Sequence, residues 1–462
     1  MRVLALLLCA GITYALSQTL ILPAMPALVA ELDADPLAVS WLLTAYLVAA
    51  SVATPLIGRL GDLLGRGRVL TWTMAVFCAG SLVCSVGDSL PLLVAGRVLQ
   101  GVAGGVFPLA YGVIRDTFPA EARMRAIGTL SVSLGVGAAL GPAVAGVIVD
   151  HAGPSAIFLV GMTGALPALA AARVIPDAPR PGRAEIDWLG AAVLGGGLAA
   201  LLILLTQGQT VGWTSAPALA LALASVMLLR AWVAVERRRR APLVDLASLR
   251  RPAVALTNIA AACVGCGIFM AYVPLAPIAQ APAATGYGFG WSVTAAGALL
   301  VPHGLVQIVA GPWAGGLCAR AGAAATLVLG AGLNTIAMVA LALVHGPLAL
   351  VALGAVLGIG QAMALTAMAN LMVAAVPRDE VGIATGVNTV MRTIGMAVGS
   401  ALSAALLAAA TAPGSALAAE WGYVIAFGVA AAATAGAVAC GLALSRAPAV
   451  SAAPARAGRA PA

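Results

Sequence analysis

Residues 58–68 read Gly-Arg-Leu-Gly-Asp-Leu-Leu-Gly-Arg-Gly-Arg and lie between two long apolar runs, at 37–58 and 69–87. Glycine lets two helix ends approach closely because it carries no side chain. The carboxylate of Asp62 can cap the N-terminus of a neighbouring helix or pair with nearby arginines. The stretch therefore predicts a tight turn between two helices, although an ordinary turn would use the same residue types. Its candidate functional positions are Gly58, Asp62, Gly65 and Arg66.

The composition of the whole chain is that of an integral membrane protein. Of its 462 residues, 62% are apolar and 9% are charged, and the mean hydropathy is +1.05. A soluble protein carries roughly a quarter charged residues. All 24 basic residues are arginines. Without lysine the chain cannot form a Walker-type phosphate loop, so it is not its own ATPase. The net charge of +8 comes mostly from arginines in short turns, which predicts orientation in a bilayer and no nucleic-acid partner.

Fourteen apolar runs are long enough to cross a bilayer as helices, since a hydrocarbon core of about 30 Å needs about 20 residues. A β-barrel would instead show alternating segments of roughly ten residues. The first run could be read as a signal peptide ending near Ser17, but it continues through Leu28 and is interpreted as a span. The predicted spans are 3–30, 37–58, 69–87, 90–113, 126–149, 154–175, 186–206, 215–235, 252–279, 291–312, 324–343, 347–376, 383–410 and 421–445.

The arginines between these runs predict the orientation, because cytoplasmic turns of membrane proteins are enriched in positive charge. With the N-terminus in the cytoplasm, the arginines of the turns and of the tail fall on the cytoplasmic side. The turns on the other side hold Glu31, Asp33, Asp35, Asp88, Asp150, His151, His345 and Glu420. A twelve-span count that omits the hairpin at 186–235 leaves the orientation unchanged. We therefore expect a multi-pass protein of a cell inner membrane with both termini cytoplasmic.

The two halves of the chain resemble each other, which indicates a duplication. Pro55, Gly58, Gly65, Pro119, Gly128, Gly137 and Gly141 recur as Pro312, Gly315, Gly322, Pro377, Gly386, Gly395 and Gly399, at a spacing of 257 or 258 residues. The predicted fold is all-α, with two six-helix bundles and an extra hairpin. The bundles are 1–175 and 252–446, the hairpin and an arginine-rich loop form the linker 176–251, and the tail 447–462 is expected to be disordered.

Further motifs connect the turn at 58–68 to a known family. Span 4 carries Arg97-Val98-Leu99-Gln100-Gly101, and span 5 carries Gly137, Gly141-Pro142 and Gly146. Together with the turn, these motifs resemble the major facilitator superfamily, specifically its fourteen-helix drug–proton antiporter branch. The helix 5 motif departs from that pattern at Ala145, where a second glycine is usual. The resemblance covers essentially the whole chain and implies a transporter, with no cofactor and no enzymatic activity.

The resemblance also implies alternating access, in which one bundle rocks against the other around a central cavity. Glycine surfaces on spans 5 and 13, the latter with Gly395 and Gly399, would let helices of opposite bundles approach and slide. Pro142 would kink span 5 after Gly141. Structural packing would also explain most of these glycines. The positions implied in span 5 are Gly137, Gly141, Pro142 and Gly146.

Ionisable side chains inside a bilayer are costly and are candidates for function. Arg97, His303 and Arg392 stand out in the interior of predicted spans. Arg97 could snorkel to the membrane surface, but the motif match implies a role in coupling. Arg392 could share a buried structural network with Asn388, one turn away. The residues assigned to proton coupling or gating are Arg97, His303, Asp62 and Arg392.

The predicted proton carrier is a histidine. The resembled branch usually has an aspartate in helix 1, where this chain has Ser17, and no carboxylate lies in the interior of a predicted span. Histidine is the side chain whose ordinary pKa lies near physiological pH. His303, with Gln307 one turn further on, is therefore expected to carry or gate the proton. A neutral histidine that is hydrogen-bonded in helix packing is the alternative.

A substrate cavity is expected on the inward faces of several spans. The spacing alone does not show which side chains point inward, and hydrogen bonding between helices is the alternative. A largely apolar, uncharged cavity would suit lipophilic or weakly basic compounds. The candidate cavity residues are Tyr14, Gln18, Phe107, Tyr111, Gln307 and Asn370. Cys263 and Cys266 have half the spacing of a metal site, but packing is favoured and no metal is predicted.

These observations predict a secondary active exporter of hydrophobic drug-like molecules or antibiotics, monomeric, with protons and membrane lipids as partners. Transport of a specific metabolite, with different or no proton coupling, stays open because the helix 1 carboxylate is missing. An intramembrane protease or transferase would need facing carboxylates, a His-Glu-x-x-His pair or a Gly-x-Ser-Gly turn, and the chain has none. Dependence of transport on ATP would identify the remaining rival, the membrane partner of a separate ATPase.

Overall fold

The computed structural model describes residues 2–172, 175, 187–239, 244, 246–291, 295–296, 299–343, 346–412 and 417–446, and this part of the chain is almost entirely helical. The first half contains α1 (Arg2–Thr19), α2 (Ile21–Glu31), α3 (Pro36–Leu64), α4 (Arg66–Val86), α5 (Leu90–Gly101), α6 (Val106–Thr117), α7 (Ala120–Ala152) and α8 (Ile157–Ala172). The linker forms α9 (Trp188–Val211), α10 (Ala216–Glu236) and the short α11 (Leu246–Leu249). The second half contains α12 (Pro252–Gln280), α14 (Leu300–Ala321), α15 (Ala323–Leu343), α16 (Pro347–Ala375), α17 (Val381–Ala409) and α18 (Glu420–Arg446). The predicted tail lies outside the described residues.

Eleven helices in the described ranges are long and apolar enough to cross a membrane. The remaining three predicted runs coincide with α7, α8 and α14. Two predicted spans are interrupted. The first breaks at Leu20 into α1 and α2, because Pro23 has no N–H to donate to the carbonyl of Thr19. The fourth contains a 3-10 turn at Val102–Gly105 between α5 and α6.

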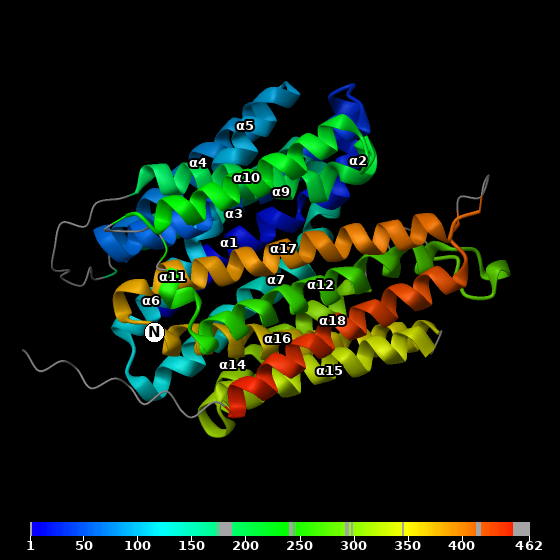
Figure 1. The fold of residues 1–462 in the computed structure, drawn as a ribbon. Helices are drawn as coiled ribbons and strands as arrows, with labels where there is room; N and C mark the ends of the chain where they lie inside the picture. The colour runs from blue at the N-terminus through cyan, green and yellow to red at the C-terminus, as the bar shows by residue number, and fades with distance from the viewer. Residues whose placement is uncertain are drawn as a thin grey trace, which may run out of the picture.

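The helices form two groups that correspond to the two halves of the sequence. In Figure 1 the helices of the first half lie mainly in the upper part, those of the second half in the lower part, and α7 and α17 run between them. Each half has its own apolar core, around Phe77 and Met74 in the first and around Phe427 and Met338 in the second. The halves meet mainly where α7 packs on α14 and α17 packs on α3.

Glycines lie at both of these crossings, and the contacts repeat with the sequence. A Cβ atom at Gly58 would overlap the backbone oxygen of Gly382, and one at Gly315 would lie 2.6 Å from the backbone oxygen of Met124. Gly58 and Gly315 are separated by 257 residues, and Met124 and Gly382 by 258 residues, which are the two spacings of the repeat. The duplicated positions therefore make equivalent contacts, one in each crossing. Because the contact is backbone to backbone, these two positions leave no room for a side chain.

The glycines predicted to slide between opposite bundles pack within single bundles instead. Gly137 and Gly141 face Ala15 and Thr19 of α1, and Gly395 and Gly399 face Ala262 and Cys266 of α12. At Gly146, no described atom lies within 4 Å of the place that a Cβ atom would take. The prediction was wrong because α7 presents several glycines on different sides. Gly135, which faces Gln307 of α14, and Gly137 are two residues apart and so point about 200° from each other around the helix. The chain of α7 is helical through Pro142, whose side chain lies outside the described set.

The extra hairpin contacts both halves through α9. Gln207 Nε2 donates to Thr44 Oγ1 of α3 at 3.0 Å, and Gln209 Nε2 donates to the carbonyl of Ala401 in α17 at 2.6 Å. The second helix of the hairpin, α10, packs on α9. Arg230 of α10, which also falls in a predicted span, is exposed. The hairpin therefore lies against the boundary between the halves rather than between them.

Candidate functional site

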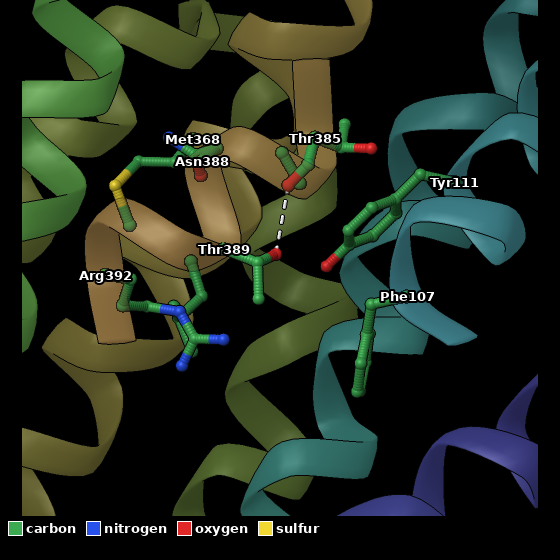
Figure 2. A pocket seen from close by; sticks show the side chains of 9 residues that line it. Phe107, Tyr111, Met368, Thr385, Asn388, Thr389 and Arg392 are labelled. Carbon is green, nitrogen blue, oxygen red and sulfur yellow. Dashed lines mark hydrogen bonds between the residues drawn. The ribbon is translucent and has the colours of Figure 1, made fainter. Parts of the chain in front are cut away.

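A cavity lies between the halves, and the empty space in it and at its opening amounts to about 380 Å³. Figure 2 shows it between α6 of the first half and α17 of the second. The lining residues are Phe107, Tyr111, Leu365, Met368, Ala369, Thr385, Asn388, Thr389 and Arg392.

One wall of this cavity is aromatic. Phe107 and Tyr111 of α6 are separated by 6.2 Å between ring centroids, and Phe107 packs edge to face on Tyr14 of α1 at 5.9 Å. Tyr14 in turn stacks on Tyr46 of α3 at 5.9 Å. These rings form a continuous row through the first half. The wall therefore offers tilted aromatic rings, against which an aromatic molecule can pack.

The opposite wall is a polar stripe on α17. Thr385, Asn388, Thr389 and Arg392 are spaced so that they lie on one side of the helix. Thr389 Oγ1 donates to the carbonyl of Thr385 at 3.0 Å, and Thr385 Oγ1 donates to that of Val381 at 2.6 Å. Both threonines thus satisfy their own hydroxyl protons within the helix. The polar residues recur at helical spacing in the sequence, and this pattern could have identified all the α17 residues that line the cavity.

Arg392 gives the cavity a positive charge. Asn388 does not bond to Arg392, since its Nδ2 donates to the carbonyl of Thr257 at 3.2 Å and to Asn258 Oδ1 at 3.1 Å, both in α12. Within the described part of the chain, the hydrogen-bond acceptor for Arg392 is the sulfur of Met396, 3.9 Å from Nη1, and no carboxylate pairs with it. The expectation of an uncharged cavity was therefore wrong.

Arg97 lies inside the first half rather than at the membrane surface. It is 1% exposed, and its guanidinium carbon lies 4.2 Å from the centroid of the Tyr46 ring. Nε donates to the carbonyl of Leu42 at 3.0 Å, and Nη1 donates to that of Ser17 at 3.1 Å and to Gln100 Oε1 at 2.7 Å. Nη2 is buried without a partner among the described residues. Arg97 therefore does not snorkel to the membrane surface. Its guanidinium group lies next to Ser17, and its described partners are all uncharged groups.

His303 is the centre of a buried polar cluster in the second half. Its Nδ1 lies 3.1 Å from the carbonyl of Gly354, and its Nε2 lies 2.5 Å from the hydroxyl of Tyr272 and 2.6 Å from Gln307 Nε2. Gln361 Oε1 lies 3.0 Å from both the Tyr272 hydroxyl and Gln307 Nε2. The cluster therefore connects α12, α14 and α16 through one imidazole.

The hydrogen bonds of this cluster suit a neutral His303, and a second proton requires neighbouring side chains to reorient. The carbonyl of Gly354 requires a proton on Nδ1, so in the neutral ring Nε2 accepts from the Tyr272 hydroxyl. After a proton binds to Nε2, that nitrogen becomes a donor to the Tyr272 oxygen. The Tyr272 hydroxyl can then turn to donate to Gln361 Oε1. Gln307 Nε2 is an amide donor 2.6 Å from the same nitrogen, so the Gln307 amide must also turn away when His303 Nε2 is protonated.

The turn at 58–68 joins the two halves at one end of the molecule. Asp62 accepts from Arg66 Nη2 at 2.7 Å and from the backbone N–H of Ile383, in the first turn of α17, at 3.2 Å. Both contacts expected for Asp62 are thus present. Arg66 also pairs with Asp116 and donates to the carbonyl of Arg378 at 2.7 Å. Because α17 belongs to the second half, these bonds hold this end closed.

The predicted cavity residues do not all lie at the cavity. Phe107, Tyr111 and Arg392 line the cavity, with Tyr14 behind Phe107. Gln307 belongs to the His303 cluster instead. Asn370 donates to the carbonyl of Thr366 in its own helix at 2.8 Å, and Gln18 is not among the described lining residues. The cavity residues that the sequence analysis missed are Leu365, Met368, Ala369, Thr385 and Thr389. In the described ranges no group of three or more metal-ligating side chains is present, and Cys263 and Cys266 are free, half-buried thiols.

Comparison with known sequences gives a match to the Major Facilitator Superfamily at residues 7–284 and 260–462. An uncharacterized MFS-type transporter of Mycobacterium tuberculosis is 31% identical over 67% of this chain, which spans 44% of that relative's length. A probable actinorhodin transporter of Streptomyces coelicolor is 30% identical over 83% of this chain and 68% of its own length. The tetracenomycin C resistance and export protein of Streptomyces glaucescens is 29% identical over 81% of this chain and 69% of its own length.

Among solved structures, the human organic anion transporter MFSD10 (TETRAN) has a similar fold, with a TM-score of 0.67. The alignment covers 95% of this chain and 99% of that chain. The sequence identity is 16%, so the likeness concerns the fold alone.

Proposed function

The chain belongs to the major facilitator superfamily, and we propose that it exports hydrophobic, drug-like small molecules such as antibiotics, driven by protons. The observation that carries this proposal is the cavity between the halves, which is lined by two aromatic rings from one half and by polar side chains from the other. The relatives named as a probable actinorhodin transporter and as a tetracenomycin C resistance and export protein support it.

The transport cycle that we propose is alternating access, with the bundles 1–175 and 252–446 as the moving bodies. The bonds of Asp62 and Arg66 to the start of α17 close one end of the molecule. Breaking them would open the cavity to that end, which we assign to the cytoplasm because the exposed arginines of the turns lie there. The drug–proton antiporter branch, a monomeric state in membrane lipid, an inner-membrane location and cytoplasmic termini belong to the same proposal.

The proton, in this proposal, binds to His303. The Tyr272 hydroxyl can donate to the neutral ring, or accept from a protonated Nε2 while it donates to Gln361 Oε1. Gln307 Nε2 donates toward the neutral ring and would turn away from the protonated one. Gln307 lies against Gly135 of α7, at the crossing between the halves. A change at His303 can therefore reach the contact that must slide during transport. The roles of Arg97 and Asp62 are then structural: the first stabilises the helices of one half, and the second closes one end.

The test is efflux of a neutral lipophilic dye, Nile red, from a pump-deficient host that expresses the chain. Export faster than from the empty host, and abolished by a protonophore, is the expected result. Efflux that survives the protonophore but stops on ATP depletion would point to a separate ATPase. No efflux, with the protein detected in the membrane, would contradict drug export and favour transport of a specific metabolite.

A further inference from the structure

We propose that the central cavity selects aromatic compounds that carry a negative charge, which pairs with Arg392. This inference specifies the substrate class and rests on the export function proposed above. It follows from the charges of the cavity, the free donors of one arginine and the position of the aromatic wall.

The described lining residues give the cavity a positive charge. Arg392 is the one ionisable side chain among its described lining residues, apart from the phenol of Tyr111. The described carboxylates nearest in the sequence to the lining helices, Asp116 and Glu380, lie at helix ends and already have partners, Arg66 and Ser248. A cationic substrate would therefore meet a like charge without a counter-ion. Charges in a medium of low dielectric constant interact much more strongly than in water, so this difference decides which substrates bind.

The guanidinium group of Arg392 has hydrogen-bond donors available to a ligand, whereas most donors of Arg97 are already used. Arg97 uses its nitrogens on the carbonyls of Leu42 and Ser17 and on Gln100, inside the first half. Arg392 makes one long contact to the sulfur of Met396, which is a weak acceptor. Figure 2 shows its guanidinium group extending from α17 into the space that Phe107 and Tyr111 face.

The geometry of the two walls suits an aromatic acid. A carboxylate can accept two parallel hydrogen bonds from a guanidinium group, which fixes its orientation. With the acid held at Arg392, an attached ring system would extend toward Phe107 and Tyr111 on α6. Because α6 and α17 belong to opposite halves, such a ligand would contact both moving bodies at once. A transporter needs this arrangement if its substrate is to influence which state it adopts.

The experiment compares three probes that share one ring system and differ in charge: anthracene-9-carboxylate, anthracene-9-carboxamide and anthracene-9-methylammonium. Their binding to the purified full-length chain in detergent is measured by equilibrium dialysis. We expect the carboxylate to bind at least about tenfold more tightly than the ammonium compound. Arg392→Gln should remove this preference by weakening carboxylate binding about tenfold, while Arg392→Lys should keep part of it.

Two controls keep folding apart from recognition. Arg320→Gln makes the same chemical change at an exposed arginine at the end of α14 and should leave all three affinities unchanged. Binding of the neutral carboxamide should persist in Arg392→Gln, which shows that the cavity is intact. A second variant, Thr389→Asp, adds a carboxylate one turn from Arg392 and should abolish the preference for the carboxylate probe by neutralising Arg392, whereas the uncharged Thr389→Asn should keep it.

The inference is overturned if the ammonium or the amide binds as tightly as the carboxylate, if Arg392→Gln leaves the carboxylate's affinity unchanged, or if none of the probes binds. Its failure differs from failure of the export function, which is decided by Nile red efflux. Charge-selective binding without any efflux would support the substrate class and contradict export. Efflux of Nile red with no preference among the three probes would support export and contradict the substrate class.

Discussion

At the scale of single residues, Arg97 and Arg392 lie in different surroundings. Arg392 faces a cavity, whereas Arg97 is enclosed, with Nη2 lacking a partner among the described residues. An unpaired buried donor of a charged group costs about 1–3 kcal/mol or more. Ser17 lies beside it, lining the same small space as Arg97 and Gln100.

We predict that Ser17→Asp stabilises the protein, because the new carboxylate can accept from Nη2 of the already buried Arg97. The expected gain is roughly 1–3 kcal/mol, measured as a higher Tm of the purified protein. The matched variant Ser17→Asn, which has a similar shape and no charge, should gain less. Equal or lower Tm for the aspartate variant would show that the added charge is not paired.

His303→Gln should uncouple transport from the proton gradient, because glutamine can keep a hydrogen bond to Tyr272 but cannot take up a proton. We expect the acceleration of Nile red efflux by an imposed pH gradient to fall at least roughly tenfold in proteoliposomes. His151→Gln, at an exposed histidine near the end of α7, is the control and should transport normally. Full proton-driven transport by His303→Gln would end the assignment of the proton to this residue.

At the scale of helices, the glycines divide into two kinds by the side of the helix on which they lie. Gly137, Gly141, Gly395 and Gly399 pack helices within a half, whereas Gly58, Gly128, Gly315 and Gly382 lie where the halves cross. In the transport cycle proposed above, only the second kind would separate. The family motif therefore marks close packing on α7, but the contact with the other half is on another side of the same helix.

Gly58→Ala should open the end of the molecule that carries Asp62. The added methyl group would overlap the backbone of Gly382, which cannot move without separating α3 from α17. A cysteine placed at the buried Thr385, in a cysteine-free background, should then react faster with a thiol reagent applied from that side. The control is Gly316→Ala, since no described atom lies within 4 Å of a Cβ at that position. Equal labelling rates in the two variants would contradict the gating role of the crossing.

At the scale of the whole molecule, the duplicated sequence has become a duplicated interface. The crossing of α3 with α17 and that of α7 with α14 use equivalent positions, such as Gly58 with Gly382 and Gly315 with Met124. The site is not duplicated in the same way. The aromatic wall of the cavity comes from one half, its cation comes from the other, and the His303 cluster belongs to the second half. Two similar bundles have therefore taken different chemical roles.

The topology gives a prediction for the whole chain in intact cells. Cysteines at Arg68 and Arg320, exposed near the turns that hold Gly65 and Gly322, should react only with membrane-permeant thiol reagents. A cysteine at the exposed Asp88, at the opposite end, should react with impermeant reagents as well. The reverse pattern would overturn the assignment of the arginine-rich turns to the cytoplasm.

The sequence by itself determined the class, the helices and the repeat. Hydrocarbon cannot hydrogen-bond to the backbone, so apolar runs of this length form helices almost regardless of their neighbours. The motifs were local enough to indicate the superfamily, and costly intramembrane charges identified Arg97, His303 and Arg392.

Only the tertiary structure shows where those charges lie, because helical periodicity gives the angle between side chains but not the direction in which the helix faces. It placed Gln307 beside His303 instead of in the cavity and turned the glycine motif of α7 toward α1. It enclosed Arg97 among carbonyls and left Arg392 open to a ligand. The rotation of each helix is set by packing against its neighbours, some of which lie far away in the chain, such as α14 against α7 and α17 against α3. The charge of the cavity therefore became visible only in the folded protein.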